Sequence, residues 1–170
     1  LLAAMDALQM GARRVLFVAH RAEILEQARR AFAWVLPDRS AGLFMGGVRD
    51  VGADLVFASV QTLRRPEQLT QWAADHFDLI VIDEFHHAAA LGYRRVLTYF
   101  RPRFMLGLTA TPERMDGAEL LTLCDDNLVF RADLAEGIAE RRLVPFAYFG
   151  LKDSVDYKAI PWLSGRFDPE

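Results

Sequence analysis

Short apolar runs of strand length alternate along this sequence with stretches that carry apolar residues at helical spacing. Runs without polar interruption are typical of strands buried on both faces, whereas strict alternation would mark strands with one face in water. We expect five such strands, over residues 14–19, 42–45, 55–60, 78–82 and 104–108. Helices are expected between them, over residues 1–10, 20–36, 66–77 and 88–100. The alternation predicts an α/β fold with a doubly wound, mostly parallel sheet.

The pattern weakens after residue 108, which suggests a second, smaller part of the chain. We expect a domain over residues 1–130 and a connecting region over residues 131–170. Further elements are predicted as helices over 117–123 and 133–142 and as strands over 128–130 and 144–150. The last ten residues show little periodicity.

Composition limits the classes of function. The chain of 170 residues is 52% hydrophobic and 25% charged, as in a packed globular protein, and its net charge is −3. Any nucleic acid must therefore bind at a local patch, because no overall basic field exists. No apolar run reaches the ~18–20 residues of a membrane span, and the N-terminus has no signal-peptide pattern. We expect no membrane association and a cytoplasmic location.

Polar residues follow the expected strands at their carboxyl ends, where parallel sheets bind ligands. These residues are His20 and Arg21, Ser59 to Gln61, Asp83 and Glu84, and Thr109 to Thr111. We therefore expect the functional groups to gather at one edge of the sheet.

The segment LIVIDEFHH, residues 79–87, carries the strongest chemical signal. A carboxylate at the tip of a buried strand can hold Mg²⁺ through its water shell, and a second carboxylate can orient or deprotonate an attacking water. Asp83 and Glu84 fit these two roles. The alternative is structural: Asp83 caps the following helix and Glu84 favours its positive end. The segment LGLTATPER, residues 106–114, allows a similar choice between hydroxyls that bridge loops and an ordinary Thr-Pro turn.

Taken together, these segments resemble the first RecA-like domain of superfamily 2 helicases, close to the DEAD/DEAH-box and ResIII members. Asp83-Glu84-Phe85-His86 is similar to motif II, the D-E-x-H form of the Walker B box, and Thr109-Ala110-Thr111 is similar to motif III. Three further segments resemble backbone-contacting motifs of the family: residues 19–27 (motif Ia), Gly46-Gly47, and residues 59–63. The co-linear match covers roughly residues 1–150.

The resemblance implies a role for each matching residue. Asp83 would hold magnesium, Glu84 would polarise water for ATP hydrolysis, and His86 would link the ATP site to a second motor domain. Thr109 and Thr111 would couple hydrolysis to movement. The nucleic-acid track would be contacted by residues of the remaining motifs: Arg21, Gly46, Gly47, Ser59, Gln61 and Thr62. ATP and Mg²⁺ are the implied cofactors, and the implied partner is nucleic acid, DNA rather than RNA.

The sequence departs from the family pattern in two places. It contains no G-x-x-x-x-G-K-[ST] phosphate loop and no second RecA-like domain with its arginine finger. The chain also opens on Leu1-Leu2-Ala3-Ala4, which is typical of a helix interior without a cap. We expect a RecA-like domain truncated at its N-terminus and a fragment that is inactive alone.

Two other classes of function stay open at this stage. Asp83, Glu84 and His86 are all metal-ligand types and could serve a metal-dependent hydrolase. A non-catalytic nucleic-acid-binding remnant is the second alternative. His87 is expected to be an ordinary surface histidine.

A last expectation concerns strand 104–108. In the family, the strand that precedes the phosphate loop pairs with the strand that corresponds to residues 104–108. That neighbour is missing from this sequence, so one edge of strand 104–108 should be unpaired. Buried unbonded backbone groups cost about 1–3 kcal/mol each. We therefore expect self-association through this edge, recruitment of a strand from the tail, or a shift of the sheet.

Overall fold

The computed structural model describes residues 1–88, 90–110, 122–150, 162–163 and 166–167. The chain divides into two compact units, Leu1–Leu128 and Val129–Glu170. The expected boundary lay two residues later than this division. No helix in the described part of the chain is long and apolar enough to cross a membrane.

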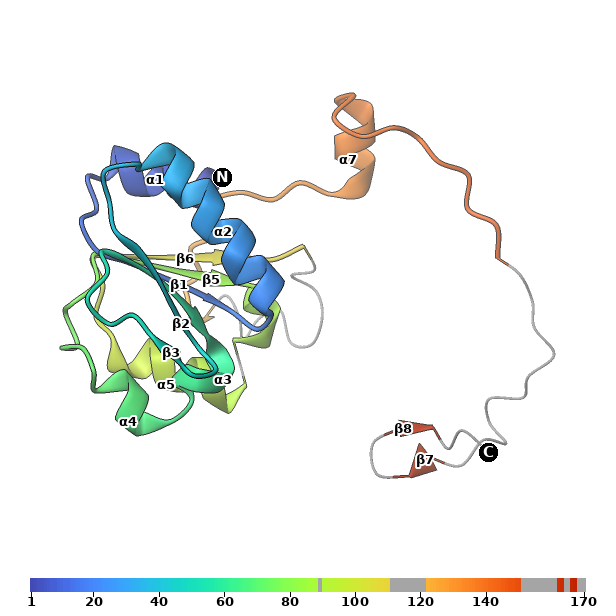
Figure 1. Cartoon of the computed structure of the whole chain (residues 1–170). Coiled ribbons are helices and arrows are strands. Elements are labelled where there is room, and N and C mark those ends of the chain that lie inside the picture. Colours follow the sequence, from blue (N-terminus) through green and yellow to red (C-terminus); the bar gives the residue numbers. More distant parts are fainter. Residues whose placement is uncertain (89, 111–121, 151–161, 164–165, 168–170) are drawn as a thin grey trace. The chain divides into compact units, whose positions relative to one another are not determined.

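Unit 1 is built on a six-stranded sheet with the order β3-β2-β4-β1-β5-β6 (Figure 1). Its strands are β1 (Val15–Ala19), β2 (Ala41–Met45), β3 (Val48–Arg49), β4 (Leu55–Ser59), β5 (Leu79–Asp83) and β6 (Phe104–Leu108). All neighbouring pairs are parallel except β2 and β3, which form an antiparallel hairpin. The predicted α/β fold with a mostly parallel sheet is confirmed, and the five predicted strands all exist.

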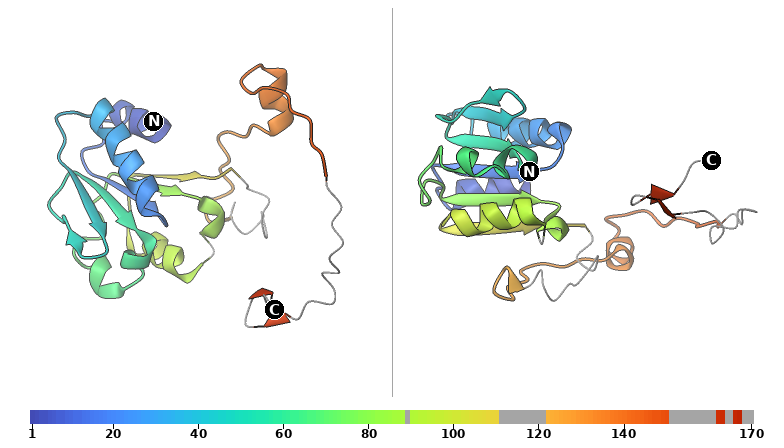
Figure 2. Two further views of the ribbon diagram at one scale, coloured as in Figure 1. Left: turned by 45° about the vertical axis from the view of Figure 1, so that its right-hand side comes forward. Right: turned by 90° about the horizontal axis from the view of Figure 1, so that it is seen from below.

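Helices cover both faces of this sheet (Figure 2). The helices are α1 (Leu2–Gln9), α2 (Ala22–Val35), α3 (Val60–Leu63), α4 (Pro66–Leu69) and α5 (Leu91–Tyr99), with a 3₁₀ turn η1 (Phe85–His87) after β5. Because successive strand residues point to opposite faces, the central strands contribute to two separate cores. Leu16 and Ile80 belong to the core that includes α3 and α5, whereas Phe17 and Val81 belong to the core that includes α1 and α2.

Two predicted boundaries in unit 1 are wrong. Val60 begins α3 instead of ending a strand, and the helix expected over 66–77 stops at Leu69. Trp72 and Phe77 both turn into the core, and the Trp72 Nε1–H donates to the Val51 carbonyl at 3.0 Å. Burial of these two large rings outweighs the helical pattern of the segment.

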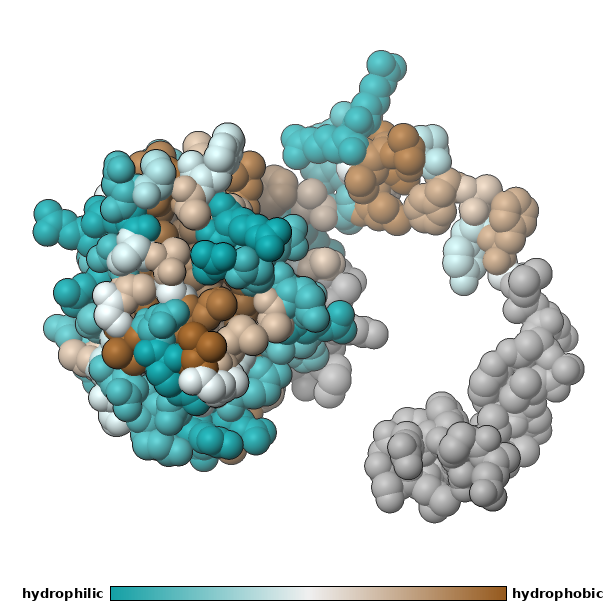
Figure 3. Space-filling model, viewed as in Figure 1, coloured by the Kyte–Doolittle hydropathy of each residue, from teal (hydrophilic) through white to brown (hydrophobic). Residues whose placement is uncertain are grey.

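Within its described residues, unit 2 has a short helix, α7 (Leu134–Ala139), and a small hairpin of β7 (Trp162–Leu163) and β8 (Arg166–Phe167). The Asp133 carboxylate caps α7 by accepting a hydrogen bond of 2.7 Å from the Glu136 backbone amide. The strands predicted over 128–130 and 144–150 are not present. Figure 3 shows hydrophobic side chains on the surface of this unit, and Val144, Tyr148 and Phe149 are more than 80% exposed. The helix predicted over 117–123 lies mostly outside the described residues.

Candidate active site and nucleic-acid interface

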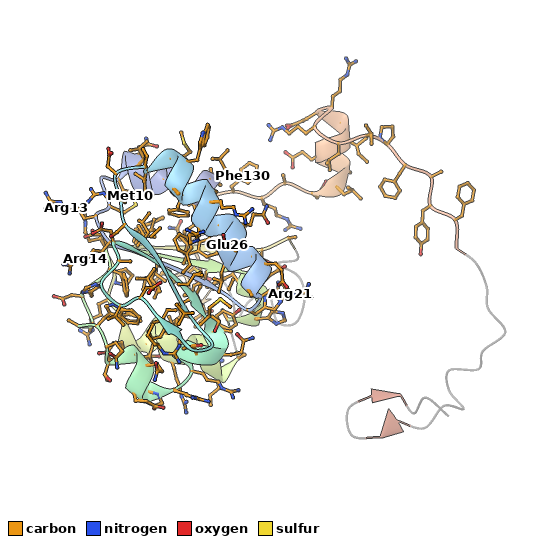
Figure 4. The ribbon with its side chains drawn as sticks, viewed as in Figure 1. Met10, Arg13, Arg14, Arg21, Glu26 and Phe130 are labelled. Atoms are coloured by element: carbon orange, nitrogen blue, oxygen red, sulfur yellow. The ribbon has the colours of Figure 1, made fainter. Side chains whose placement is uncertain are left out.

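The carboxyl ends of β4, β1, β5 and β6 lie side by side and bring the predicted site residues to one edge. The register pairs Ala19 with Ser59, Val18 with Ile82, and Asp83 with Leu108. Residues that follow these positions therefore start at the same height. Figure 4 shows Arg21 at this end of the sheet, whereas Arg13 and Arg14 lie at the opposite end. Thr111 lies outside the described residues.

Two carboxylates stand next to each other at the tip of β5. Burial raises the pKa of Asp83 above its ordinary value, and the negative charge of Glu84 raises it further. Glu84 adopts a left-handed backbone conformation with φ 53° and ψ 49°, which is uncommon for a residue with a side chain. Neither carboxylate caps η1, because the capping position belongs to Glu84 and its side chain makes no capping bond. The capping role of Asp83 in the structural alternative is therefore not supported, whereas Glu84 does stand at the N-terminal end of η1.

His86 connects the end of β5 to the end of β6. Its Nδ1 lies 3.0 Å from Thr109 Oγ1 and 3.2 Å from Glu84 Oε2. Because a carboxylate only accepts hydrogen bonds, Nδ1 donates to Glu84 in the tautomer that carries its proton there. The His86 side chain is only 9% exposed and that of Glu84 is 35% exposed. His86 is thus held inside the edge while Glu84 reaches toward solvent.

The turn between Glu84 and His86 is positioned by a close contact with β6. Phe85 is buried, and its ring packs directly on Gly107. A Cβ atom at position 107 would stand only 2.6 Å from Phe85 Cγ. The absence of a side chain at Gly107 therefore allows Phe85 to hold its two site neighbours against the sheet.

The segment after β4 divides into structural and exposed side chains. Ser59 Oγ accepts a hydrogen bond from the Thr62 backbone amide at 3.3 Å and lies 2.9 Å from Thr62 Oγ1, so this pair caps α3. Thr62 is buried, whereas Gln61 and Arg21 are exposed. Among the predicted track residues of β1 and β4, Arg21 and Gln61 are therefore the most accessible.

Gly46 and Gly47 form the two-residue turn between β2 and β3. Gly46 has a φ of 53°, which favours glycine at this position. Arg49 donates to the Gly46 and Val48 carbonyls at 2.7 Å each, and its guanidinium lies 4.9 Å from the Phe44 ring centroid. The double glycine thus has a structural explanation, and its role in nucleic-acid binding stays a prediction.

The sequence placed His20 at this edge without a role, took His87 for a surface histidine and did not mark Tyr93 as part of the site. The rings of His20 and His87 are 6.0 Å apart, and those of His86 and His87 are 4.1 Å apart. The buried Tyr93 hydroxyl has no hydrogen-bond partner among the described residues. Burial raises the pKa of Tyr93 to about 12, and the charges of Asp83 and Glu84 add to the increase. The sequence signal that could have found them is their position: His20 directly follows a strand, and His87 and Tyr93 lie in the turn and the helix after motif II.

Strand β6 lies at the edge of the sheet, with only β5 beside it in the described part of the chain. It is not flanked by both β1 and β5, and β7 and β8 pair with each other instead of joining it. Neither a recruited tail strand nor a closed gap is present in the described residues. Self-association through β6 therefore stays a prediction. If the chain is an ordered monomer in solution with this edge unpaired, the expected energetic penalty is wrong.

The described residues contain no group of three or more His, Cys, Asp or Glu side chains placed to hold one metal ion. The His20 ring contacts that of His87, and the His87 ring contacts that of His86, whereas the contact with a carboxylate is made by His86 at Glu84. This geometry does not favour the metal-dependent hydrolase.

Fold and site together define a RecA-like domain of the superfamily 2 helicase type. The chain belongs to the family described as "Type III restriction enzyme, res subunit", whose pattern matches residues 1–114. The predicted resemblance is thereby confirmed.

Individual relatives agree with this family. The chain is 30% identical over 155 residues to IRC3 of Saccharomyces cerevisiae, classed as an ATP-dependent helicase, covering 85% of this chain and 22% of the relative. It is 33% identical over 100 residues to "DNA 3'-5' translocase XPB2" of Sulfurisphaera tokodaii, covering 58% of this chain and 22% of the relative. The chain thus spans about a fifth of these relatives' length.

Among solved structures, the fold is similar to the SWI2/SNF2 ATPase core of Sulfolobus solfataricus in complex with double-stranded DNA. The TM-score is 0.55 at 16% sequence identity, and the match covers 71% of this chain and 26% of that chain. At this identity the likeness shows the fold alone.

Proposed function

We propose that this chain is part of the first motor domain of an ATP-dependent helicase or translocase that moves along DNA. One observation carries the proposal: the Asp83 and Glu84 carboxylates share a sheet edge with Arg21 and Gln61, two exposed side chains suited to phosphate contacts. Because the hydrolysis site and the DNA-binding residues would share one edge of the sheet, DNA binding could affect ATP hydrolysis and hydrolysis could affect DNA binding.

Mg²⁺ fits the carboxylate pair. Partial burial and the adjacent Glu84 charge both disfavour the ionised form of Asp83, and a divalent cation would relieve this penalty. Asp83 would hold the ion through its water shell. Magnesium, when bound, supplies positive charge for the phosphate oxygens. Glu84 would orient and deprotonate the attacking water, and its contact with His86 Nδ1 fixes the direction of the carboxylate.

The assigned roles extend to the neighbouring strand and beyond this domain. Thr109 would couple hydrolysis to movement through its contact with His86, and Thr111 would act with it. His86 would also link the ATP site to a second motor domain.

We expect ATP to bind only to a protein that also contains a phosphate-binding loop. The 170 residues contain no G-x-x-x-x-G-K-[ST] sequence, so they lack the lysine and the backbone amides that cradle phosphates. We expect no meaningful ATPase activity from these residues alone.

Substitution Glu84→Gln in the complete protein tests the proposed chemistry. The carboxamide keeps the shape but cannot accept the proton, so hydrolysis should be lost while ATP binding stays largely intact. Glu67→Gln is the matched control, because Glu67 is exposed on α4, away from the site edge. If Glu84→Gln retained turnover within a few-fold of the unsubstituted protein, the role of Glu84 would be refuted. A complete protein that binds DNA without hydrolysing ATP would support the non-catalytic alternative.

Substitution Arg21→Ala tests the track. Backbone contacts carry no sequence information, so binding should weaken about equally for all sequences and the salt slope should fall by about one unit. Competition between DNA and RNA of one sequence tests the preferred substrate, and DNA should bind more tightly. A change of sequence preference in Arg21→Ala, or tighter binding of RNA, would contradict the corresponding assignment.

A further inference from the structure

The two exposed track side chains are both tied to one residue, His20. The Arg21 Nε–H donates to His20 Nε2 at 3.1 Å, and the Gln61 side-chain amide donates to the His20 backbone carbonyl at 3.0 Å. Any movement of Arg21 or Gln61 toward a ligand therefore changes the restraints on His20.

The His20 ring continues toward the hydrolysis site through ring contacts. It meets the His87 ring edge to face, with the centroids 6.0 Å apart and the planes at 72°. The His87 ring lies against His86 at 4.1 Å, and His86 Nδ1 contacts both Glu84 and Thr109. Rings at such separations are in direct contact, so the position of one ring limits the positions open to the next. An unbroken path of named contacts thus joins Arg21 to Glu84.

The hydrogen bond at the start of this path competes with DNA binding. An arginine that takes a phosphate side-on uses its Nε–H together with one terminal N–H, and this charge-assisted contact is stronger than a bond to neutral imidazole. Because His20 Nε2 accepts from Arg21, the ring proton resides on Nδ1. That buried Nδ1 has no partner among the described residues, so it provides no second restraint on the ring. Release by Arg21 leaves the His20 ring free to change its contact with His87.

We propose that the His20–His87 ring contact transmits the binding of a DNA phosphate at Arg21 to the Glu84 carboxylate, a coupling that rests on the proposed function above. His87 acts as a relay on this path: its ring contacts those of His20 and His86, and it passes a shift that DNA binding starts at His20 to the contact between His86 and Glu84. Stimulation of hydrolysis by DNA then depends on the ring at position 87, whereas hydrolysis without DNA does not.

The first test measures ATP turnover by the complete protein with and without duplex DNA. We expect His87→Ala to keep basal turnover and the KM for ATP but to lose the stimulation by roughly 5-fold or more. His87→Phe should restore stimulation, because it keeps an aromatic ring without a titratable nitrogen. Trp34→Ala is the control: it removes an exposed aromatic ring on α2, outside the contact path, and should behave like the unsubstituted protein. Full stimulation of His87→Ala, or no rescue by His87→Phe, would overturn the coupling. No stimulation of the unsubstituted protein would instead refute the proposed function, and the coupling with it.

The second test needs no ATP and uses the 170-residue chain. A short duplex oligonucleotide is titrated while the backbone amide resonances are followed by NMR. We expect shifts at residues 20, 21 and 61 and also at residues 84–88, and the second group should be lost in His87→Ala while the first persists. Shifts confined to residues 20, 21 and 61 in the unsubstituted chain would overturn the proposal.

Discussion

Substitution Gly107→Ala should destabilise unit 1, because the added methyl group collides with a buried ring. The new Cβ would stand 2.6, 2.8 and 2.9 Å from three ring carbons of Phe85, well inside van der Waals contact. Phe85 is 5% exposed and belongs to a core cluster, so its ring cannot move into solvent without losing that burial.

The expected magnitude follows from two opposing effects. Overpacking of a core costs about 1–3 kcal/mol. Replacing glycine by alanine restricts the unfolded chain and returns about 0.4–1 kcal/mol. The net loss of unfolding free energy should be about 1–2 kcal/mol, which for a unit of this size lowers Tm by roughly 3–10 °C.

Urea and thermal denaturation of the 170-residue chain, followed by circular dichroism, measure this loss. Gly52→Ala is the control, because no atom lies within 4 Å of its added Cβ. Phe85→Leu combined with Gly107→Ala should recover part of the loss relative to the sum of the single variants. Equal stability of the Gly107→Ala and Gly52→Ala variants would refute the steric role of the close contact.

Three further predictions concern other parts of unit 1. Burial acts to raise the pKa of Asp78, but its carboxylate accepts hydrogen bonds from the Arg13 and Arg14 backbone amides at 2.8 and 3.0 Å, and with these bonds the pKa lies below its ordinary value. This stability is present above the unfolded pKa and is lost as pH falls through the folded pKa. Asp78→Asn should therefore cost about 1–2 kcal/mol at pH 7, and the cost should shrink as pH falls below the ordinary pKa of an aspartate. A cost in urea titrations that does not shrink with falling pH would contradict it. Tyr93→Phe removes a buried hydroxyl that has no partner in the described part of the chain, so denaturation should show unchanged or higher stability. A loss above about 1 kcal/mol would mean that the hydroxyl is bonded. The free edge of residues 104–108 should make the isolated chain self-associate, which sedimentation over a range of concentrations would detect; a monomer at every concentration would contradict it.

The main features of the sheet could be predicted because its strands are buried on both faces. The runs that became Val15–Ala19 and Leu79–Asp83 contain no polar interruption before their final residues, and this pattern identifies strands of a covered parallel sheet. The two-residue strand Val48–Arg49 was missed, because two residues carry no periodicity. The run over 144–150 was wrongly predicted to be a strand: it has the composition of one, but a strand also needs a neighbour to accept its hydrogen bonds.

The sequence predicted those residues of the candidate site that directly follow a strand. Asp83 and Thr109 follow β-strands directly, so their meeting at one edge follows from the parallel order of the sheet. The contact of His20 with His87 could not be foreseen. It depends on the adjacency of β1 and β5 and on the orientation of two rings, and neither leaves a mark on the sequence.

The left-handed backbone of Glu84 makes position 84 a point where stability and activity select for different residues. A non-glycine residue in this conformation loses about 1 kcal/mol relative to a relaxed backbone, whereas glycine or asparagine adopts it more easily. A library of variants sorted for thermal resistance alone should therefore enrich glycine or asparagine here and discard the carboxylate. Sorting the same library for ATP turnover should restore glutamate at the expense of melting temperature. Directed evolution of the complete protein would need both criteria at once to keep this residue.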